Sequence, residues 1–324
     1  MNIQSDKPKR ILVITLSNIG DVILTTPVIY AINRQFPEAR LDVMASAQGV
    51  EIFEDDPKIF KVIPYNKHGS FMEKFRLIKK LRGTGYDMVV DLRNTLMPFF
   101  LSARYKTSLF KTRCGYLRHK KDAHLYRIKK LGINIDGAKM YLDIPSKDVE
   151  YVDRLLGKYD PGKCMIAISP GAKSLIKRWT IESLARVCDK LITECALQLV
   201  MVGDKTDRKI IDEMLAKMKG KPANLAGYTS IKQLGEILRR CSMLIANDSA
   251  PMHVASAVGT KVLAIFGPTS TAKYGPSGKD DVVVKASLKC MPCEVAQCRF
   301  GTNACMKSIS EGEVFEVAKR MLQK

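Results

Sequence analysis

A carboxylate that could act as a general base follows the first apolar run of the chain. Residues 11–16 are mostly apolar, and the short turn Ser17–Asp21 comes next, with Gly20 allowing a tight bend. Asp21 precedes a stretch with helical spacing. Its side chain could therefore take a proton from a hydroxyl group or cap the first turn of that helix. The residue types alone leave both roles open.

Two further segments could hold an anion. Residues 169–180 combine small residues with three cations ahead of a helical pattern, and backbone N–H groups beside such cations bind phosphate groups. Residues 246–253 read Ala-Asn-Asp-Ser-Ala-Pro-Met-His and also lead into a helix, whose N-terminus can face a diphosphate. A solvated basic loop around Trp179 and a packing role for His253 are the alternatives.

Four of the nine cysteines are clustered near the C-terminus. Their spacing, Cys290-x2-Cys293-x4-Cys298-x6-Cys305, is typical of metal ligands. Three interpretations are open: a structural zinc, free or partly oxidised structural thiols, and an iron–sulfur cluster. The other five cysteines are too scattered for a disulfide framework and are expected to behave as small apolar residues.

The elements that must position these groups alternate between strand and helix. Strand-like runs lie at residues 9–16, 40–45, 60–65, 87–92, 164–169, 197–202, 243–246 and 261–266. Helical spacing covers residues 22–35, 71–82, 180–193, 205–218, 231–241, 250–258 and 311–322. We expect a kink at Pro27 and a helix end at Gly83.

This rhythm predicts an α/β protein with open, mostly parallel sheets. A chain of 324 residues exceeds the roughly 250–300 at which a single core stops growing, so we expect two doubly wound, Rossmann-like domains. The expected domains are residues 1–160 and 161–310, and a final helix at 311–324 could pack back on the first domain. Ligands of such sheets bind at the carboxyl ends of the strands, so we expect the domains to face each other across a cleft.

The charge balance predicts an anionic partner. Fifty-three basic residues against 33 acidic ones give a net charge of +20, and residues 104–130 hold ten basic residues and one acidic residue. A phosphorylated substrate, an acidic membrane surface and a nucleic acid all fit this surplus. Aromatic residues interleave with the basic segment, which keeps a nucleic-acid-binding protein open as an alternative.

Several classes of protein are disfavoured. No apolar run reaches the roughly 18 residues that a membrane-spanning helix needs, and the first residues lack a signal-peptide core. We therefore expect a cytoplasmic protein. No G-x-G-x-x-G follows the first strand, which disfavours a dinucleotide-dependent dehydrogenase. The P-loop-like segment Gly157–Cys164 precedes a strand instead of following one, so we reject it as a phosphate loop.

Five segments resemble, in the right order, the signatures of one known family. In the first half these are residues 11–27 (a strand, an S-x-G-D element and a helix), 86–92 and 113–116 (R-x-G-Y). In the second half they are residues 177–179 (K-R-W-P, with Thr180 for Pro) and 247–259 with 266–269 (D-T-G-x-x-H…F-G-P-T, with Ser249-Ala250 for Thr-Gly). The family is the heptosyltransferases, glycosyltransferase family 9, which builds the inner core of lipopolysaccharide from ADP-heptose.

The resemblance implies the GT-B architecture, with the acceptor on the N-terminal domain and the nucleotide sugar on the C-terminal domain. It matches Asp21 to the general base that deprotonates the acceptor hydroxyl, and Lys177 to the cation on the diphosphate. The residues that it matches to the nucleotide-sugar site are Gly171, Ala172, Lys177, Asp248, Ser249, Ala250 and His253. The implied reaction is an inverting displacement through an oxocarbenium-like state, and it requires no metal or cofactor.

The resemblance also gives the basic segment a role. A lipopolysaccharide core acceptor carries phosphate and acidic sugars on a membrane lipid, and Arg93, Arg113, Arg118 and Lys120 could bind these anions. The remaining cations could hold the enzyme peripherally on the inner membrane, at roughly 1 kcal/mol each near the surface. A solvated loop that serves solubility is the alternative. Two alternative functions stay open: a transferase and an epimerase, each using another nucleotide sugar.

Overall fold

The structure is a computed structural model that describes residue 3, residues 6–108 and residues 119–323. Contacts divide the chain into two compact units, residues 1–143 and 144–324, which are described separately below. This division differs from the expected boundary at residue 160. The reason is helix α7 (Ser146–Leu156), which packs on α10 (Ile231–Arg240) of the second unit. Arg240 pairs with Asp153 across this contact at 2.7 Å.

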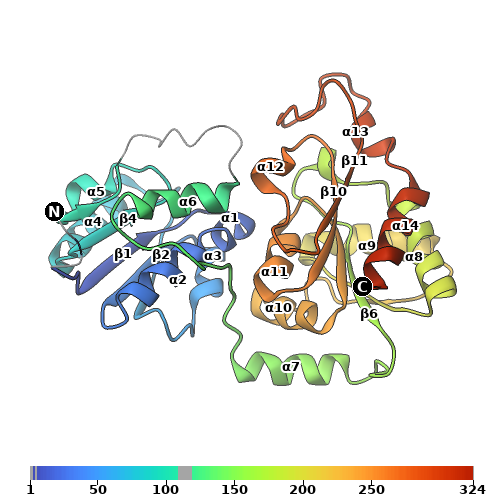
Figure 1. The fold of residues 1–324 in the computed structure, drawn as a ribbon, viewed down its shortest axis with the longest axis horizontal. Helices are drawn as coiled ribbons and strands as arrows, with labels where there is room; N and C mark the ends of the chain where they lie inside the picture. Colours follow the sequence, from blue (N-terminus) through green and yellow to red (C-terminus); the bar gives the residue numbers. More distant parts are fainter. Residues whose placement is uncertain (1–2, 4–5, 109–118, 324) are drawn as a thin grey trace. The chain divides into compact units, whose positions relative to one another are not determined.

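The described part of the first unit forms a five-stranded parallel sheet in the order β3-β2-β1-β4-β5 (Figure 1). Its strands are β1 (Arg10–Ile14), β2 (Arg40–Ala45), β3 (Lys61–Pro64), β4 (Met88–Asp91) and β5 (Tyr105–Lys106). Strands β1 and β4 lie beside each other in the middle, and helices cover both faces, so the two strands read as continuous apolar runs. The short edge strand β5 was not predicted.

Six described helices accompany this sheet: α1 (Ile19–Ile23), α2 (Thr26–Gln35), α3 (Ala47–Phe53), α4 (Phe71–Thr84), α5 (Met97–Phe100) and α6 (Lys120–Lys129). The expected single helix with a kink at Pro27 is instead two helices, because Pro27 lies in the first turn of α2, where its missing N–H costs nothing. Helix α4 runs past Gly83 to Thr84 and is capped by Gly85, whose φ of 67° is left-handed.

The described part of the second unit forms a six-stranded parallel sheet in the order β11-β10-β9-β6-β7-β8. Its strands are β6 (Met165–Ser169), β7 (Gln198–Met201), β8 (Ala223–Asn224), β9 (Met243–Asn247), β10 (Lys261–Phe266) and β11 (Val282–Lys285). Besides α7 and α10, its helices are α8 (Ile181–Cys195), α9 (Arg208–Lys217), α11 (Ala250–Val258), α12 (Thr271–Tyr274), α13 (Ala304–Lys307) and α14 (Glu311–Leu322), with 3₁₀ turns η1 (Leu175–Lys177) and η2 (Lys205–Asp207).

The C-terminal helix α14 belongs to the second unit. It packs on α8, and Val314, Phe315 and Ala318 are buried in the core between the helices and the sheet. The expectation that this helix returns to the first domain is therefore not met. An apolar stripe at helical spacing shows that a helix covers a core but does not say which core.

Both sheets are doubly wound about a central pair of strands. In the first unit the strand order reverses between β1 and β4, and in the second between β6 and β9. Loops that leave the carboxyl ends of such a pair form the usual ligand site of an open parallel sheet. The predicted α/β architecture of two Rossmann-like units is confirmed. Among the described residues, none of the helices has the length and apolar composition that a bilayer-spanning helix needs.

Candidate functional site

The buried side-chain amide of Asn247 holds the loop after β6, residues 170–179, in the second unit. Asn247 ends β9, and its Nδ2 donates to the carbonyl oxygen of Pro170 at 2.7 Å. Its Oδ1 accepts a hydrogen bond from the backbone N–H of Trp179 at 3.0 Å. Asn247 therefore ties both ends of the 170–179 loop to the strand beside β6. We did not predict this role, although its place after an apolar run and before a helix was a usable signal.

The predicted residues Lys177 and Asp248 are paired at the same place. Lys177 Nζ lies 2.7 Å from Asp248 Oδ2, with side-chain exposures of 32 % and 7 %. The cation comes from the turn after β6 and the carboxylate from the loop after β9, so the pair spans the point where the strand order reverses. A partly exposed lysine in this position can meet a phosphate group while Asp248 fixes its direction.

Close packing explains the glycine at position 171. A Cβ atom there would overlap the carboxylate of Asp207, and one at Gly203 would lie 2.7 Å from Asp207 Oδ2. Burial raises the pKa of Asp207, and its Oδ2 accepts a hydrogen bond from the Asp204 N–H at 3.1 Å. The Asp207 side chain thus fills the space between the loops after β6 and β7 and leaves no room for a side chain at position 171 or 203. The Gly203-Asp204 pair after β7 was the overlooked sequence signal.

Helix α11 begins at the carboxyl end of β9. Ser249 is its N-cap residue, but its hydroxyl donates to the Asn247 carbonyl at 3.3 Å instead of capping a backbone N–H group. Ala250 and Pro251 form the first turn, and the predicted residue His253 is buried in the second. The unpaired N–H groups of such a first turn, with the helix dipole behind them, favour an anion.

One departure from the family signature, at Thr180, has a local explanation. Thr180, where the family has proline, caps α8 by accepting a hydrogen bond from the Ser183 N–H at 3.3 Å. The predicted residue Ala172 is buried, and its carbonyl oxygen accepts from Arg178 Nε at 2.8 Å. The loop after β6 is therefore held from within as well as by Asn247.

In the first unit, Asp21 follows the carboxyl end of β1. It lies in the first turn of α1, and its Oδ2 accepts a hydrogen bond from Asn18 Nδ2 at 3.0 Å. Asn18, not Asp21, occupies the N-cap position of this helix. Asp21 is partly exposed, so its carboxylate can be reached by a ligand. Its role as general base stays a prediction.

A second carboxylate, which we did not predict, organises the loop after β4. Asp91 is buried, and its Oδ1 accepts from the Arg93 N–H at 2.8 Å. Its Oδ2 accepts from the N–H and the hydroxyl of Thr95 at 2.6 and 2.8 Å. The loop in turn presents the predicted residue Arg93, whose guanidinium carbon lies 4.9 Å from the ring centre of Tyr65, after β3. The aspartate at the end of this apolar run was the sequence signal.

Further cations lie on α6, which begins at the predicted residue Lys120. Arg127 donates to Asn94 Oδ1 and, at 3.2 Å, to the Ser108 carbonyl oxygen, and burial lowers the pKa of Arg127. Burial, followed by the charge of Arg127, lowers the pKa of His124 to about 3. Two other predicted acceptor-binding residues, Arg113 and Arg118, lie outside the described residues.

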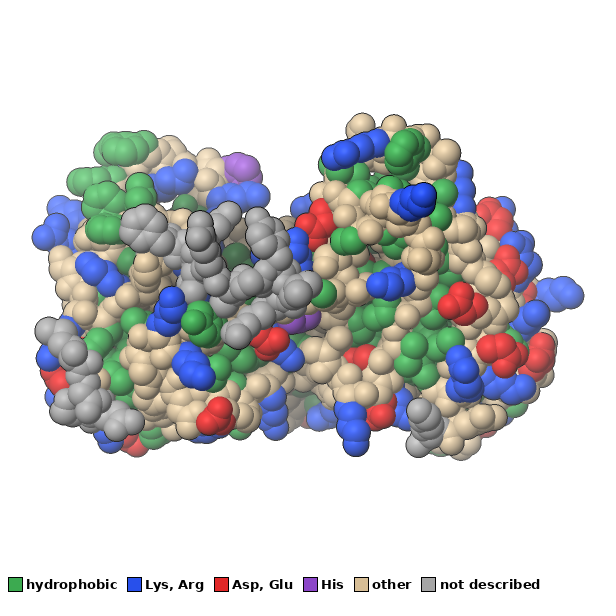
Figure 2. Space-filling view, turned by 45° about the horizontal axis from the view of Figure 1, so that its top comes forward, with side chains coloured by type: hydrophobic (Ala, Val, Ile, Leu, Met, Phe, Trp, Pro, Cys, Tyr) green, Lys and Arg blue, Asp and Glu red, His purple; other side chains and the backbone are tan. Residues whose placement is uncertain are grey.

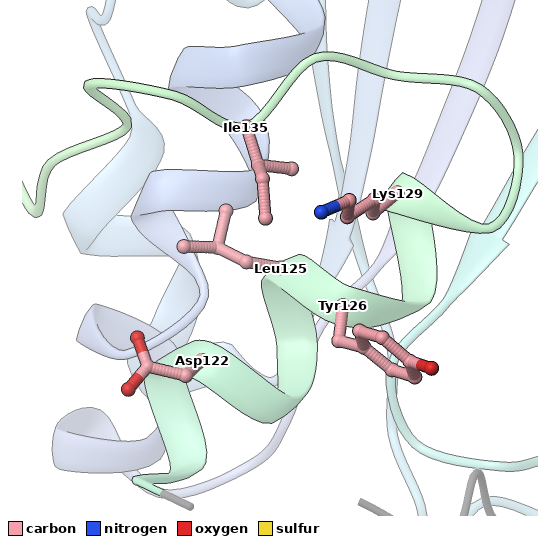
Figure 3. Close-up of a pocket in the computed structure, with 5 residues that line it drawn as sticks. All are labelled: Asp122, Leu125, Tyr126, Lys129 and Ile135. Carbon is pink, nitrogen blue, oxygen red and sulfur yellow. The ribbon is translucent and has the colours of Figure 1, made fainter.

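A surface hollow of about 370 Å³ lies beside α6 (Figure 3). It is lined by Asp122, Leu125, Tyr126, Lys129 and Ile135. In the close-up, Leu125 and Ile135 face each other across it, and Asp122 and Lys129 lie at opposite ends. None of the predicted site residues lines this hollow.

The four clustered cysteines differ in their surroundings. Cys290 is exposed, whereas Cys305 on α13 is buried and would lie 3.3 Å from a Cβ atom at Gly267. Backbone N–H groups of Asn303 and Phe300 lower the pKa of Cys298. Over residues 3, 6–108 and 119–323, no three or more His, Cys, Asp or Glu side chains are grouped so that they could hold a metal ion. Burial, followed by the charges of Cys293, Cys290 and Cys298, raises the pKa of Cys305, so the four thiols lie near one another. The three interpretations of the cluster stay predictions.

Two doubly wound units, each with charged loops at the carboxyl ends of its central strands, have the architecture of GT-B glycosyltransferases. The family model for glycosyltransferase family 9 (heptosyltransferase) matches residues 74–304. The chain belongs to this family and is a glycosyltransferase.

Similar proteins fall in the same family. A lipooligosaccharide heptosyltransferase 2 of Campylobacter jejuni is 27 % identical over 316 residues, covering 94 % of this chain and 96 % of the relative. A family 9 glycosyltransferase structure from Veillonella parvula has a TM-score of 0.86 at 23 % identity, covering 97 % of both chains. The E. coli ADP-heptose lps heptosyltransferase II has a TM-score of 0.78 at 22 % identity, covering 97 % of this chain and 98 % of its own. The last two likenesses show the fold.

Proposed function

We propose that this enzyme transfers a heptose from ADP-heptose to the inner core of lipopolysaccharide, with inversion at the anomeric carbon. The observation that carries the proposal is the Lys177–Asp248 pair beside the start of α11, at the β6/β9 switch point. Membership of family 9 supports the heptosyl reaction, and relatives named as heptosyltransferases span nearly the whole chain.

In this proposal the second unit binds the donor. Lys177 contacts the diphosphate, and the first turn of α11, with Ser249 and Ala250, receives it through backbone N–H groups. Gly171 and Ala172 form the neighbouring turn, where the lack of a side chain at 171 makes room for the Asp207 carboxylate that packs against the loop. Asp248 holds Lys177 in place, and His253 supports the helix behind the site.

The first unit would bind the acceptor. The acceptor hydroxyl oxygen attacks the anomeric carbon, its proton passes to Asp21, and the bond from that carbon to the diphosphate oxygen breaks as ADP leaves. Lys177 and the α11 dipole stabilise the negative charge that develops on ADP. Arg93 and Lys120, with Arg113 and Arg118 of the basic segment, would bind the acidic sugars and phosphates of the acceptor. No metal or cofactor is required.

The proposed place of action is the inner surface of the inner membrane, because the acceptor is carried on a lipid. Attachment there would be peripheral, through cations of the first unit.

The experiment is product analysis with ADP-heptose and a Kdo-terminated inner-core acceptor. We expect ADP release coupled to the gain of one heptose by the acceptor, with the opposite anomeric configuration by NMR. Release of an altered sugar with the acceptor unchanged would instead identify an epimerase. If transfer occurred only from another nucleotide sugar, ADP-heptose would not be the donor. Tight binding of a labelled oligonucleotide without ADP binding would favour a nucleic-acid-binding protein.

A further inference from the structure

Large apolar side chains of the first unit are exposed on two neighbouring helices. The set is Phe71, Met72 and Phe75 on α4 with Leu96, Phe99 and Phe100 on and just before α5, each between 52 % and 80 % exposed. The two helices are in contact, and we call these six side chains together the apolar end. Figure 2 shows hydrophobic side chains gathered at this end of the first unit, with Lys and Arg beside them.

Packing in the core does not account for these side chains. Helix α4 covers the sheet with Leu77, Ile78 and Leu81, which join the core that also holds Met97 of α5. The first turns of α4 extend beyond that contact. At about 200 Å² for a whole phenylalanine side chain, the four exposed rings alone present roughly 500 Å². With Met72 and Leu96 the surface exceeds the roughly 300–600 Å² of the largest patch on a typical monomer.

The charge around the apolar end is strongly positive. Residues 67–106 contain nine basic and three acidic residues. The three acidic side chains are all engaged within the unit. Glu73 closes the capping box of α4, Asp87 accepts from the Lys9 and Arg10 N–H groups, and Asp91 holds the loop after β4. Lys106 Nζ, in contrast, lies 5.5 Å from the ring centre of Phe99, so a cation stands directly at the apolar surface.

We propose that the apolar end docks onto an anionic lipid bilayer, with its aromatic rings in the interfacial region and its lysines and arginines on lipid headgroups. Exposed aromatic side chains with basic residues beside them are the combination by which helices lie in a membrane interface. A second copy of this chain is the other candidate occupant. It would bring an equal positive charge onto the same face, whereas an anionic bilayer complements that charge.

The position of this surface fits a lipid-linked acceptor, an argument that rests on the proposed function. Leu96 of the apolar end lies only three residues after Arg93, and the buried Asp91 side chain fixes the loop between them. An enzyme docked through this end would hold Arg93 at headgroup level. It could then meet the charged core of its acceptor while the acyl chains remain in the bilayer.

The test is co-sedimentation of the full-length protein with phosphatidylcholine vesicles, with and without about one-third phosphatidylglycerol. Neither donor nor acceptor is added, so the result does not depend on the transfer reaction. We expect binding to the anionic vesicles that weakens at high salt. The double variant Phe71→Ser, Phe99→Ser should weaken this binding at least tenfold. The matched control, Phe300→Ser with Tyr228→Ser, exchanges exposed aromatic residues of the second unit and should bind like wild type.

Thermal melting and ADP affinity of the first variant should match those of wild type, since Phe71 and Phe99 are exposed. The control should melt slightly lower, because it loses the hydrogen bond from Arg208 Nη2 to the Tyr228 hydroxyl at 2.9 Å. If melting of the first variant shifts, the charge variant Lys79→Glu, Lys80→Glu on α4 replaces it, with the same expected loss. Equal binding by test and control variants, or no binding by wild type, would overturn the proposal. So would a wild-type dimer by light scattering that the first variant converts to monomer, because a second copy would then cover the surface.

Discussion

Replacing Lys177 by methionine removes the cation proposed to hold the diphosphate and keeps most of the side-chain volume. A hydrogen bond to a charged group contributes about 1.5–3 kcal/mol, or roughly 10- to 150-fold in affinity. Lys177 is about one-third exposed, which argues for the lower part of that range. Its loss, however, leaves the 7 % exposed carboxylate of Asp248 unpaired beside an anionic ligand. We therefore expect ADP to bind roughly 30- to 100-fold more weakly.

The assay is titration calorimetry with ADP on the full-length protein. Lys173→Met removes the same charge from an exposed position of the same loop and should change the ADP dissociation constant by less than about threefold. The double variant Lys177→Met, Asp248→Asn removes the orphaned carboxylate and should regain about tenfold of the lost affinity. Equal losses for Lys173→Met and Lys177→Met would refute the reasoning, since only the net charge of the loop would then matter.

Three further predictions concern the framework of the sites. Gly83→Ala should stabilise the protein by about 0.5–1 kcal/mol, because open space surrounds this helical position. Gly171→Ala should destabilise the protein, because the added Cβ atom would overlap Asp207. Urea unfolding measures both changes in stability. Asn247→Leu should cost about 2–3 kcal/mol and weaken ADP binding, because the loop after β6 loses its two anchors. His124→Leu should reduce the loss of stability between pH 7 and pH 5, which urea unfolding at both values measures.

The sign of the histidine effect follows from its pKa. The folded pKa of His124, about 3, lies below the unfolded value, so the unfolded chain takes up a proton first as the pH falls. Stability is therefore full above about pH 6.5 and is lost as the pH falls towards 3, by about 2 kcal/mol at pH 5 from this group. An unchanged pH dependence in the leucine variant would contradict the assignment of this effect to His124. Unaltered ADP affinity in Asn247→Leu would contradict the anchoring role of Asn247.

The architecture could be predicted from the sequence because its central strands are buried on both faces. Runs such as residues 40–45 and 261–266 coincide with β2 and β10. Three edge strands were not predicted: β5 and β8 have two residues each, too few for a pattern to register, and the four-residue β11 was missed as well. Helix α7 was missed, and with it the domain boundary, because its partner α10 lies some eighty residues away in the chain.

Site residues with a signature in the sequence could be named, but their partners could not. The Lys177–Asp248 pair joins two motifs separated by about seventy residues, and no spacing rule connects them. Asp207 and Asp91 act on backbone groups through burial and hydrogen bonds, and such contacts become visible only once the strands are adjacent.

The central claim is that Asp21 takes the acceptor proton while residues of the second unit hold ADP. The most direct measurement is the turnover number of Asp21→Asn, compared with its dissociation constant for ADP. The account predicts that turnover falls by more than about a hundredfold, the range for loss of a general base, while ADP affinity stays unchanged. Turnover near the wild-type value would contradict it, and so would a matching loss of both quantities, which would assign Asp21 to holding the fold of its helix.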